Sequence, residues 1–160
     1  MDITALKKNG YTYTYDETVE SLIGELPPLD LWQSDQEGVQ FPKNVNLSKA
    51  HDYIYETYVQ DNFIICDFGY SNIWNNTDIP STVWHNDLPE GSNIFFMYYL
   101  NDVSNGGELC FQVDGLETGC IQPKKHLLVL GSQEEHVRHK VNLTKETRIV
   151  CNFGFKIQWI

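Results

Sequence analysis

The sequence is poor in positive charge and contains no long apolar segment. Lys and Arg number 11 against 22 Asp and Glu, so the formal net charge is −11 at neutral pH. A chain that grips nucleic-acid phosphates over a broad surface needs the opposite balance, so this charge argues against such a partner. No stretch approaches the roughly 20 apolar residues of a membrane span, and residues 1–18 lack the apolar run of a signal peptide. These absences favour a soluble protein without a membrane partner.

The sequence also lacks any Cys-x-x-Cys pair. Its four cysteines are far apart and lie in apolar, strand-like runs, where free cysteine behaves as a small buried hydrophobe: Cys66, Cys110, Cys120 and Cys151. We therefore expect reduced cysteines and a cytoplasmic protein.

The chain of 160 residues is expected to form a single domain over 1–160, because it shows no internal repeat or low-complexity linker. From Phe63 onward, short β-branched and aromatic runs are separated by Gly, Asn, Asp and Pro. This pattern predicts a mainly β fold, a sandwich or barrel such as a jelly roll. Strands are expected near 62–68, 70–74, 81–87, 93–101, 107–113, 124–130, 137–142 and 147–157.

The N-terminal part is predicted to add helices that flank the sheet. Residues 16–23 have acids in what would be the first turn of a short helix, and Pro27-Pro28 would end it. Asn46 or Ser48 could cap a second helix that runs through Tyr58. Short strands are expected at 11–15, where Tyr and Thr alternate, and at 39–41.

The candidate functional residues begin with His85 and Asp87 in the stretch Trp84-His85-Asn86-Asp87. Successive side chains of a strand alternate between its faces, so an imidazole and a carboxylate two residues apart can bind one cation. A second histidine would complete a facial triad, which leaves three positions of an octahedron free and is typical of non-haem Fe(II) enzymes that activate dioxygen. A lone His-x-Asp also arises often from ordinary strand-surface polarity.

The second histidine must come from His126, His136 or His139. A hairpin centred between residues 143 and 144 would place His139 opposite Arg148 on the same face of two paired strands. A guanidinium beside a metal ligand could then hold an acid that chelates the metal with its other end. His136 has the opposite parity on a regular strand and would be the ligand only if the strand bulges.

These residues, in their order along the chain, resemble the Fe(II)- and 2-oxoglutarate-dependent oxygenases, and within them the prolyl 4-hydroxylase-like branch. The resemblance covers about 84–155 and depends on the order of its motifs. They are His85-x-Asp87, Tyr98-Tyr99-Leu100-Asn101, Gly106-Gly107-Glu108-Leu109-Cys110-Phe111, Leu127-Leu128-Val129-Leu130, His139-Lys140-Val141 and Arg148.

The resemblance implies a double-stranded β-helix in which His85, Asp87 and His139 hold Fe(II) and form the catalytic centre. It implies that Arg148 binds the distal carboxylate of the co-substrate 2-oxoglutarate, and that the Tyr99 hydroxyl donates to the same carboxylate. The reaction would be hydroxylation of a C–H bond with dioxygen, with succinate and carbon dioxide as co-products and ascorbate as a supporting reductant. Gly154 departs from the pattern, since relatives often carry a bulky residue there.

The resemblance points to a prolyl residue of a peptide or protein as the substrate, and a free amino acid or another small metabolite is the alternative. The loops at 75–81 and 102–105 are expected to line the mouth of the site, and Trp74 could stack on a proline ring or lie in the core. Two other classes remain open: a cupin-like jelly roll that binds a metal or ligand, and an interaction module without catalysis. The cupin-like alternative leaves Arg148 beside His139 unexplained, and the intact set of ligands argues against an interaction module.

Overall fold

The computed structural model describes residues 1–77, 83–87 and 93–160 of the chain, and it is mainly β. The helices are α1 (Ile3–Asn9), α2 (Thr18–Ile23) and α3 (Ser48–Ile54), which continues as a π-helical turn over Tyr55–Val59; a 3₁₀ turn covers Leu29–Leu31. The strands are β1 (Tyr11–Tyr15), β2 (Gln33–Ser34), β3 (Gln40–Phe41), β4 (Phe63–Asp67), β5 (Ser71–Asn75), β6 (Ile94–Tyr99), β7 (Leu109–Val113), β8 (Leu116–Ile121), β9 (Leu127–Ser132), β10 (Val137–Val141) and β11 (Ile149–Trp159).

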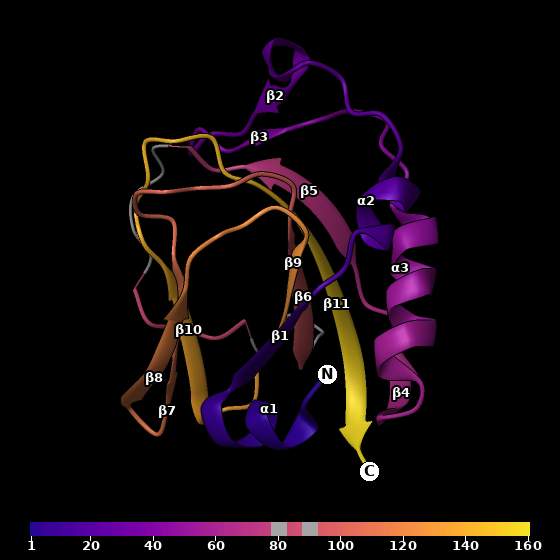
Figure 1. The fold of residues 1–160 in the computed structure, drawn as a ribbon, viewed down its shortest axis with the longest axis vertical. Coiled ribbons are helices and arrows are strands. Elements are labelled where there is room, and N and C mark those ends of the chain that lie inside the picture. The colour runs from indigo at the N-terminus through magenta and orange to yellow at the C-terminus, as the bar shows by residue number, and fades with distance from the viewer. Residues whose placement is uncertain (78–82, 88–92) are drawn as a thin grey trace.

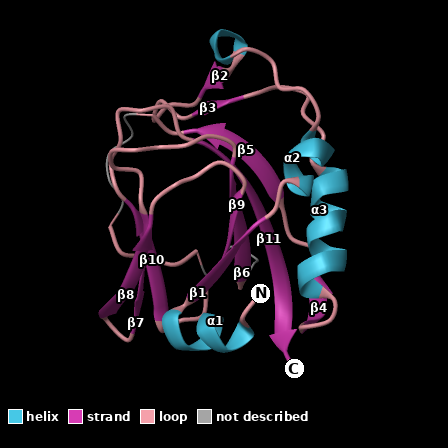
Figure 2. Ribbon diagram, in the orientation of Figure 1, coloured by secondary structure: helices cyan, strands magenta, loops and turns pink. Residues whose placement is uncertain are grey.

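Two antiparallel sheets face each other (Figure 1). The larger sheet has the order β1-β9-β6-β11-β5-β3-β2, and β4 also pairs with β11. The smaller sheet has the order β10-β7-β8, and His85 forms an isolated bridge with His139 on the free side of β10. The predicted double-stranded β-helix with flanking N-terminal helices is confirmed, and Figure 2 shows α2 and α3 on the face of the larger sheet that points away from the smaller one.

The core has two layers because the central strands are buried on both faces. Along β6, Phe95, Met97 and Tyr99 point between the two sheets, whereas the intervening residues, such as Phe96 and Tyr98, pack with the helices. This explains why β6 reads as a continuous apolar run, Ile94–Tyr99, and not as an alternating one. The cavity described below lies in the layer between the sheets.

Helix α1 and strand β8 were not predicted. The side chain of Asp2 accepts a hydrogen bond from the Ala5 backbone N–H at 3.0 Å, and Gly10, with a φ of 82°, ends α1. Strand β8 follows β7 through a two-residue turn at Asp114 and Gly115, both with positive φ. Asp-Gly is the strongest short-range signal for a β-hairpin, so the sequence did contain the information for β8.

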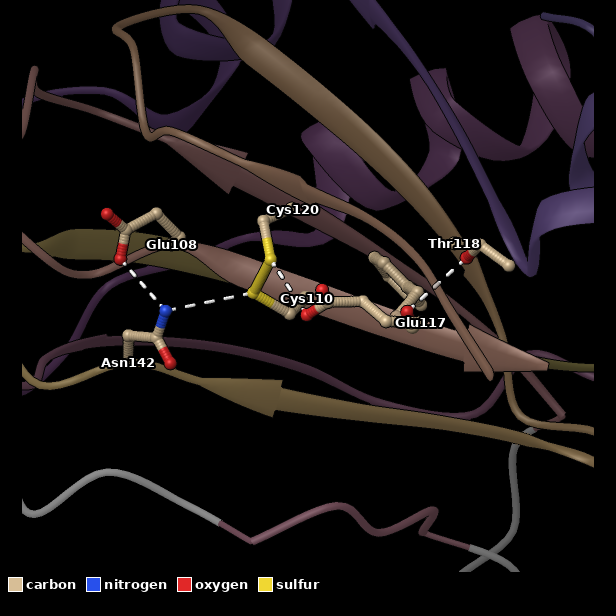
Figure 3. Close-up of a disulfide and its surroundings, with 7 residues drawn as sticks. Glu108, Cys110, Glu117, Thr118, Cys120 and Asn142 are labelled. Atoms are coloured by element: carbon tan, nitrogen blue, oxygen red, sulfur yellow. Dashed lines mark hydrogen bonds between the residues drawn. A yellow bond between two sulfur atoms is a disulfide. The ribbon is translucent and has the colours of Figure 1, made fainter. Parts of the chain in front are cut away.

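The expectation that all four cysteines are free is wrong, because Cys110 and Cys120 form a disulfide (Figure 3). The two residues lie directly opposite each other on β7 and β8, so the missed hairpin is what brings them together. Cys66 and Cys151 are free. The argument for a reducing, cytoplasmic compartment therefore no longer holds. None of the helices in the described parts of the chain has the length and apolar character needed to cross a membrane.

Candidate metal centre

His85, Asp87 and His139 converge on one point between the sheets. His85 and His139 exchange both backbone hydrogen bonds, at 3.0 and 2.8 Å, so their side chains lie opposite each other on one face. Asp87, two residues further on, has one carboxylate oxygen 3.7 Å from Nε2 of His85 and the other 3.5 Å from Nε2 of His139. One potential ligand atom from each residue lies within 4.8 Å of the other two, which is the spacing that a single cation needs.

The surroundings of these side chains favour metal binding. Nδ1 of His85 lies 2.7 Å from the Val83 carbonyl, an arrangement that puts the proton on Nδ1 and leaves the Nε2 lone pair free. The ring of His139 is buried between the sheets, 5.0 Å from the ring of Phe95. Hydrogen bonding with His139 lowers the pKa of the Asp87 carboxyl against the opposing effect of burial, so this group is an anion at neutral pH. Two imidazoles and one carboxylate form a set of donors that suits Fe(II).

The other histidines lie away from this cluster. His136 is exposed in the turn before β10, and His126 makes a hydrogen bond with Glu20 on the helix side of the larger sheet. Nε2 of His51 lies 2.9 Å from the carbonyl of Phe68. Of the three candidates for the second histidine, His139 is the one that the structure brings to His85 and Asp87.

A cavity of about 210 Å³ opens from the three candidate ligands. Aromatic and aliphatic side chains make part of its wall, and amide side chains and one arginine make the rest. The lining residues are Tyr70, Trp74, Asn76, His85, Asp87, Phe95, Met97, His139, Val141, Asn142, Arg148 and Asn152. Of the two predicted loops, the described residues at 102–105 do not reach this cavity, and most of 75–81 lies outside the described residues.

Arg148 lies in the cavity wall with only 1% of its surface exposed. Its Nε donates to the Gly107 carbonyl at 3.0 Å and its Nη1 to Oδ1 of Asn76, also at 3.0 Å. Its Nη2 donates to the Tyr99 hydroxyl at 3.2 Å and lies 3.5 Å from Sδ of Met97. Among the described residues, no Asp or Glu forms an ion pair with this guanidinium. A buried charge without a counter-ion is costly, so the arrangement calls for an anionic ligand in the cavity.

Tyr99 lies behind Arg148. Its hydroxyl accepts from Nη2 of Arg148 and donates to Sδ of Met97 at 3.2 Å. Burial raises the pKa of this hydroxyl, so it is neutral. Tyr99 therefore holds the guanidinium in place, and its predicted contact with 2-oxoglutarate stays a prediction.

The predicted hairpin between the strands of His139 and Arg148 is wrong. β10 pairs with β7, where His139 lies opposite Phe111, and β11 pairs with strands of the other sheet. The chain after β10 instead crosses from one sheet to the other and passes against Gly106, where a Cβ atom would overlap the Leu143 carbonyl. His139 and Arg148 reach the same cavity from opposite sheets.

Two features that hold Arg148 in the site were not predicted. Asn76 and the Gly107 carbonyl hold Arg148, and a Cβ at Gly107, whose φ is 73°, would lie 3.3 Å from Cδ of Arg148. Trp74, an open question in the sequence, lines the cavity, and its buried Nε1 has no hydrogen-bond partner among the described residues. Nothing local marks Asn76, because its role depends on the pairing of β5 with β11.

No family model and no curated protein matches the sequence. Solved structures do match. A prolyl hydroxylase from Trichoplax adhaerens, in complex with a peptide fragment of the hypoxia inducible factor oxygen degradation domain, is 14% identical with a TM-score of 0.66, over 96% of this chain and 87% of that one. A 2OG-Fe(II) oxygenase family oxidoreductase from Burkholderia pseudomallei is 12% identical with a TM-score of 0.65, over 96% and 88%. A Pseudomonas putida prolyl-4-hydroxylase is 19% identical with a TM-score of 0.63, over 96% of both chains.

This chain has the fold of the 2-oxoglutarate- and Fe(II)-dependent oxygenases. The resemblance noted from the order of the motifs is thus confirmed at the level of the fold, and identities of 12–19% establish no more than that. In this oxygenase fold, the His85, Asp87 and His139 cluster and Arg148 lie in one cavity between the two sheets.

Proposed function

We propose that the protein is an Fe(II)- and 2-oxoglutarate-dependent dioxygenase that hydroxylates a C–H bond of its substrate. The observation that carries this proposal is the buried guanidinium of Arg148, which has no carboxylate partner among the described residues and shares a small cavity with His85, Asp87 and His139. A simple metal-binding jelly roll does not need this arginine. An oxo acid with a second carboxylate would use both ends of the cavity. Its oxo-acid end would bind the metal held by His85, Asp87 and His139, and its second carboxylate would bind Arg148.

His85, Asp87 and His139 would hold Fe(II) through two imidazole Nε2 atoms and one carboxylate oxygen. Three protein ligands leave three octahedral positions, enough for a chelating 2-oxo acid and dioxygen. When bound, the iron would supply a site for the activation of dioxygen, which is the oxidant. 2-Oxoglutarate would supply two electrons as it is decarboxylated to succinate and carbon dioxide, so that one oxygen atom enters succinate and the other enters the substrate C–H bond. Ascorbate would support the activity by keeping the iron reduced.

The remaining residues of the cavity orient the co-substrate and limit the access of water. Arg148 would bind the distal carboxylate through charge-assisted hydrogen bonds. Tyr99 and Asn76 fix the direction of the guanidinium. Phe95, Met97 and Val141 contribute apolar surface to the wall beside the candidate ligands, which keeps the site dry.

For the substrate, we propose a prolyl residue in a peptide or protein, with the whole chain as a single catalytic domain. Support comes from the fold, since several similar structures are prolyl hydroxylases and one was solved with a peptide. The net charge of −11 argues against a nucleic acid. A free amino acid or small metabolite is the alternative.

The test is release of succinate from 2-oxoglutarate in the presence of Fe(II), ascorbate and dioxygen, with the protein in which His139 is replaced by Ala as the control. Proline-containing peptides and free amino acids are then added separately, and mass spectrometry measures the gain of one oxygen atom. Succinate release that is equal in wild type and His139→Ala would refute the oxygenase proposal. Oxygen gain in amino acids but not in peptides would refute the peptide substrate alone.

A further inference from the structure

Among the described residues, no strand pairs with one edge of β5 over most of its length. β11 pairs with β5 from Ser71 to Asn75, whereas β3, on the other edge, pairs only at Asn75, which lies opposite Gln40. No other strand within residues 1–77, 83–87 and 93–160 borders this edge. An open strand edge is a template for pairing with another extended chain.

The register shows which backbone groups point to the open edge. Tyr70 and Gly154 exchange both backbone hydrogen bonds, at 3.3 and 2.8 Å, so Tyr70 directs its backbone groups to β11. These directions alternate along an antiparallel strand. Ser71 and Ile73 therefore direct their N–H and C=O groups away from β11 and into the open edge.

β3 does not continue along this edge for a chemical reason. The antiparallel register that puts Gln40 opposite Asn75 would put Pro42 opposite Ile73, and proline has no N–H to donate to a neighbouring strand. The chain then turns at Asn44, which has a φ of 60°, and runs on to α3 (Figure 1). The segment 42–47 thus passes along β5 without forming a strand.

Two hollows lie between β5 and this segment. The first, here called the edge groove, has a volume of about 300 Å³ and is lined by residues that include Ser71, Ile73 and Pro42. Trp74 lines both the edge groove and the cavity of the candidate metal centre. A more open hollow of about 620 Å³ continues from the edge groove at Ser71, and Tyr70 lines both this hollow and the cavity.

We propose that the edge groove binds an extended polypeptide substrate as an additional antiparallel strand on β5, with the residue to be hydroxylated opposite Asn72. This inference rests on the proposed function and names the surface by which the substrate is held. The peptide runs antiparallel to β5 because β3, which occupies the same edge at Asn75, does so. Its backbone bonds are made with Ser71 and Ile73.

The geometry of such a strand favours proline at one position. Residues directly opposite each other share a face, so the peptide residue opposite Asn72 points to the side of the sheet on which Tyr70 and Trp74 line the cavity. This residue lies between those that bond to Ser71 and Ile73, so its own N–H points away from β5. The peptide residue opposite Asn72 therefore has its side chain toward the cavity and its N–H away from β5. Proline, which has no N–H, can occupy this position without the loss of a hydrogen bond to β5.

The charge of the residues around the edge groove limits which polypeptide segments can bind there. The described residues that line the two hollows include Asp35 and Asp52 but no Lys or Arg. The remaining polar groups are mostly amides and hydroxyls, such as those of Asn44 and Ser48, which suit a peptide backbone. A neutral or basic segment therefore fits, and a strongly acidic one does not.

The first test uses nine-residue peptides with a central proline and randomised flanks, and protein loaded with 2-oxoglutarate and Zn(II), which prevents turnover. The peptide retained best is resynthesised with a single N-methyl group on different backbone nitrogens, and its affinity is measured by calorimetry. Methylation one residue from the proline, on either side, should weaken binding about tenfold, because a backbone hydrogen bond is lost. Methylation two residues away should change it less than about twofold.

The second test uses the protein. Ser71→Pro removes an N–H that points into the edge groove and leaves the ladder with β11 intact, so peptide affinity should fall about tenfold. Ser71→Ala, the control, should bind the peptide as the wild type does. Both variants should keep the wild-type affinities for Zn(II) and 2-oxoglutarate, which shows that they are folded.

The backbone amides of the wild-type protein can be followed by NMR spectroscopy. The amide signals of Ser71 and Ile73 should shift when the peptide is added, and the amide signal of Asn72 should shift far less.

Failure of this inference can be told apart from failure of the proposed function. If the library contains no peptide that binds, or if N-methylation weakens binding equally at all positions, strand addition to β5 is refuted even when the protein decarboxylates 2-oxoglutarate. Peptide binding that is unchanged in Ser71→Pro would also refute it. If the protein does not turn over 2-oxoglutarate, in contrast, the proposed function is refuted.

Discussion

Replacing Arg148 with alanine should weaken the binding of 2-oxoglutarate far more than that of the metal. A guanidinium has five N–H donors, and the structure commits three of them to oxygen acceptors, on Gly107, Asn76 and Tyr99. Among the residues that the structure describes, the second donor on Nη1 has no acceptor, and the second donor on Nη2 has only the thioether of Met97. These two are free for a carboxylate, and both lie in a wall from which water is largely excluded.

The expected size of the effect follows from these two donors. A hydrogen bond to a charged group contributes about 1.5–3 kcal/mol, and two such bonds to one carboxylate are not fully additive. We expect a loss of about 2–4 kcal/mol, which is roughly a 30-fold to 800-fold rise in the dissociation constant of 2-oxoglutarate. Removal of the buried charge also leaves the Gly107 carbonyl and the Asn76 side chain without their donor, so thermal stability has to be measured alongside.

The assay is calorimetric titration of 2-oxoglutarate into protein loaded with Zn(II). Arg138→Ala is a matched control, because Arg138 lies on β10 next to His139 but is exposed. This control should bind 2-oxoglutarate as the wild type does, and both variants should keep wild-type affinity for Zn(II). If the Arg148→Ala protein is folded and its affinity for 2-oxoglutarate stays within about threefold of wild type, then Arg148 does not bind the co-substrate. This result would contradict the proposed function.

Three further predictions concern single side chains. His139→Ala should abolish stoichiometric Fe(II) binding, measured by metal analysis after gel filtration, whereas His136→Ala should not; the reverse result would show that the ligand is His136. Tyr99→Phe removes one acceptor of the Arg148 guanidinium and should raise the dissociation constant of 2-oxoglutarate about twofold to tenfold without changing metal affinity; no change would mean that Tyr99 does not position the guanidinium. Iodoacetamide should modify Cys66 in the folded protein but not Cys151, because burial raises the pKa of the Cys151 thiol; mass mapping of equal modification at both would contradict the structure.

Much of the fold can be predicted from the sequence because its signals are local. The run Ile94–Tyr99 is apolar at every position, which is typical of a central strand that is buried on both faces, and the alternation of Tyr and Thr predicts β1. The order of the motifs from His85 to Arg148 pointed to the oxygenase fold. The Asp114-Gly115 turn was also readable, and with it the strand that brings Cys120 to Cys110.

The sequence by itself determined the parity of β10, and therefore that His139 and Val141 point to one side. It also predicted a strand over 81–87, but the described residues 83–87 form only the isolated bridge of His85 with His139. It did not determine which strands pair, because pairing depends on burial and chain closure between segments that are distant in sequence. The tertiary structure decided that His139 lies opposite His85 and Phe111 and not opposite Arg148. It also decided that Asn76, which directly follows β5 of the larger sheet, holds the guanidinium of Arg148. The local pattern sets the direction of a side chain, and only the packing of the two sheets sets what it meets.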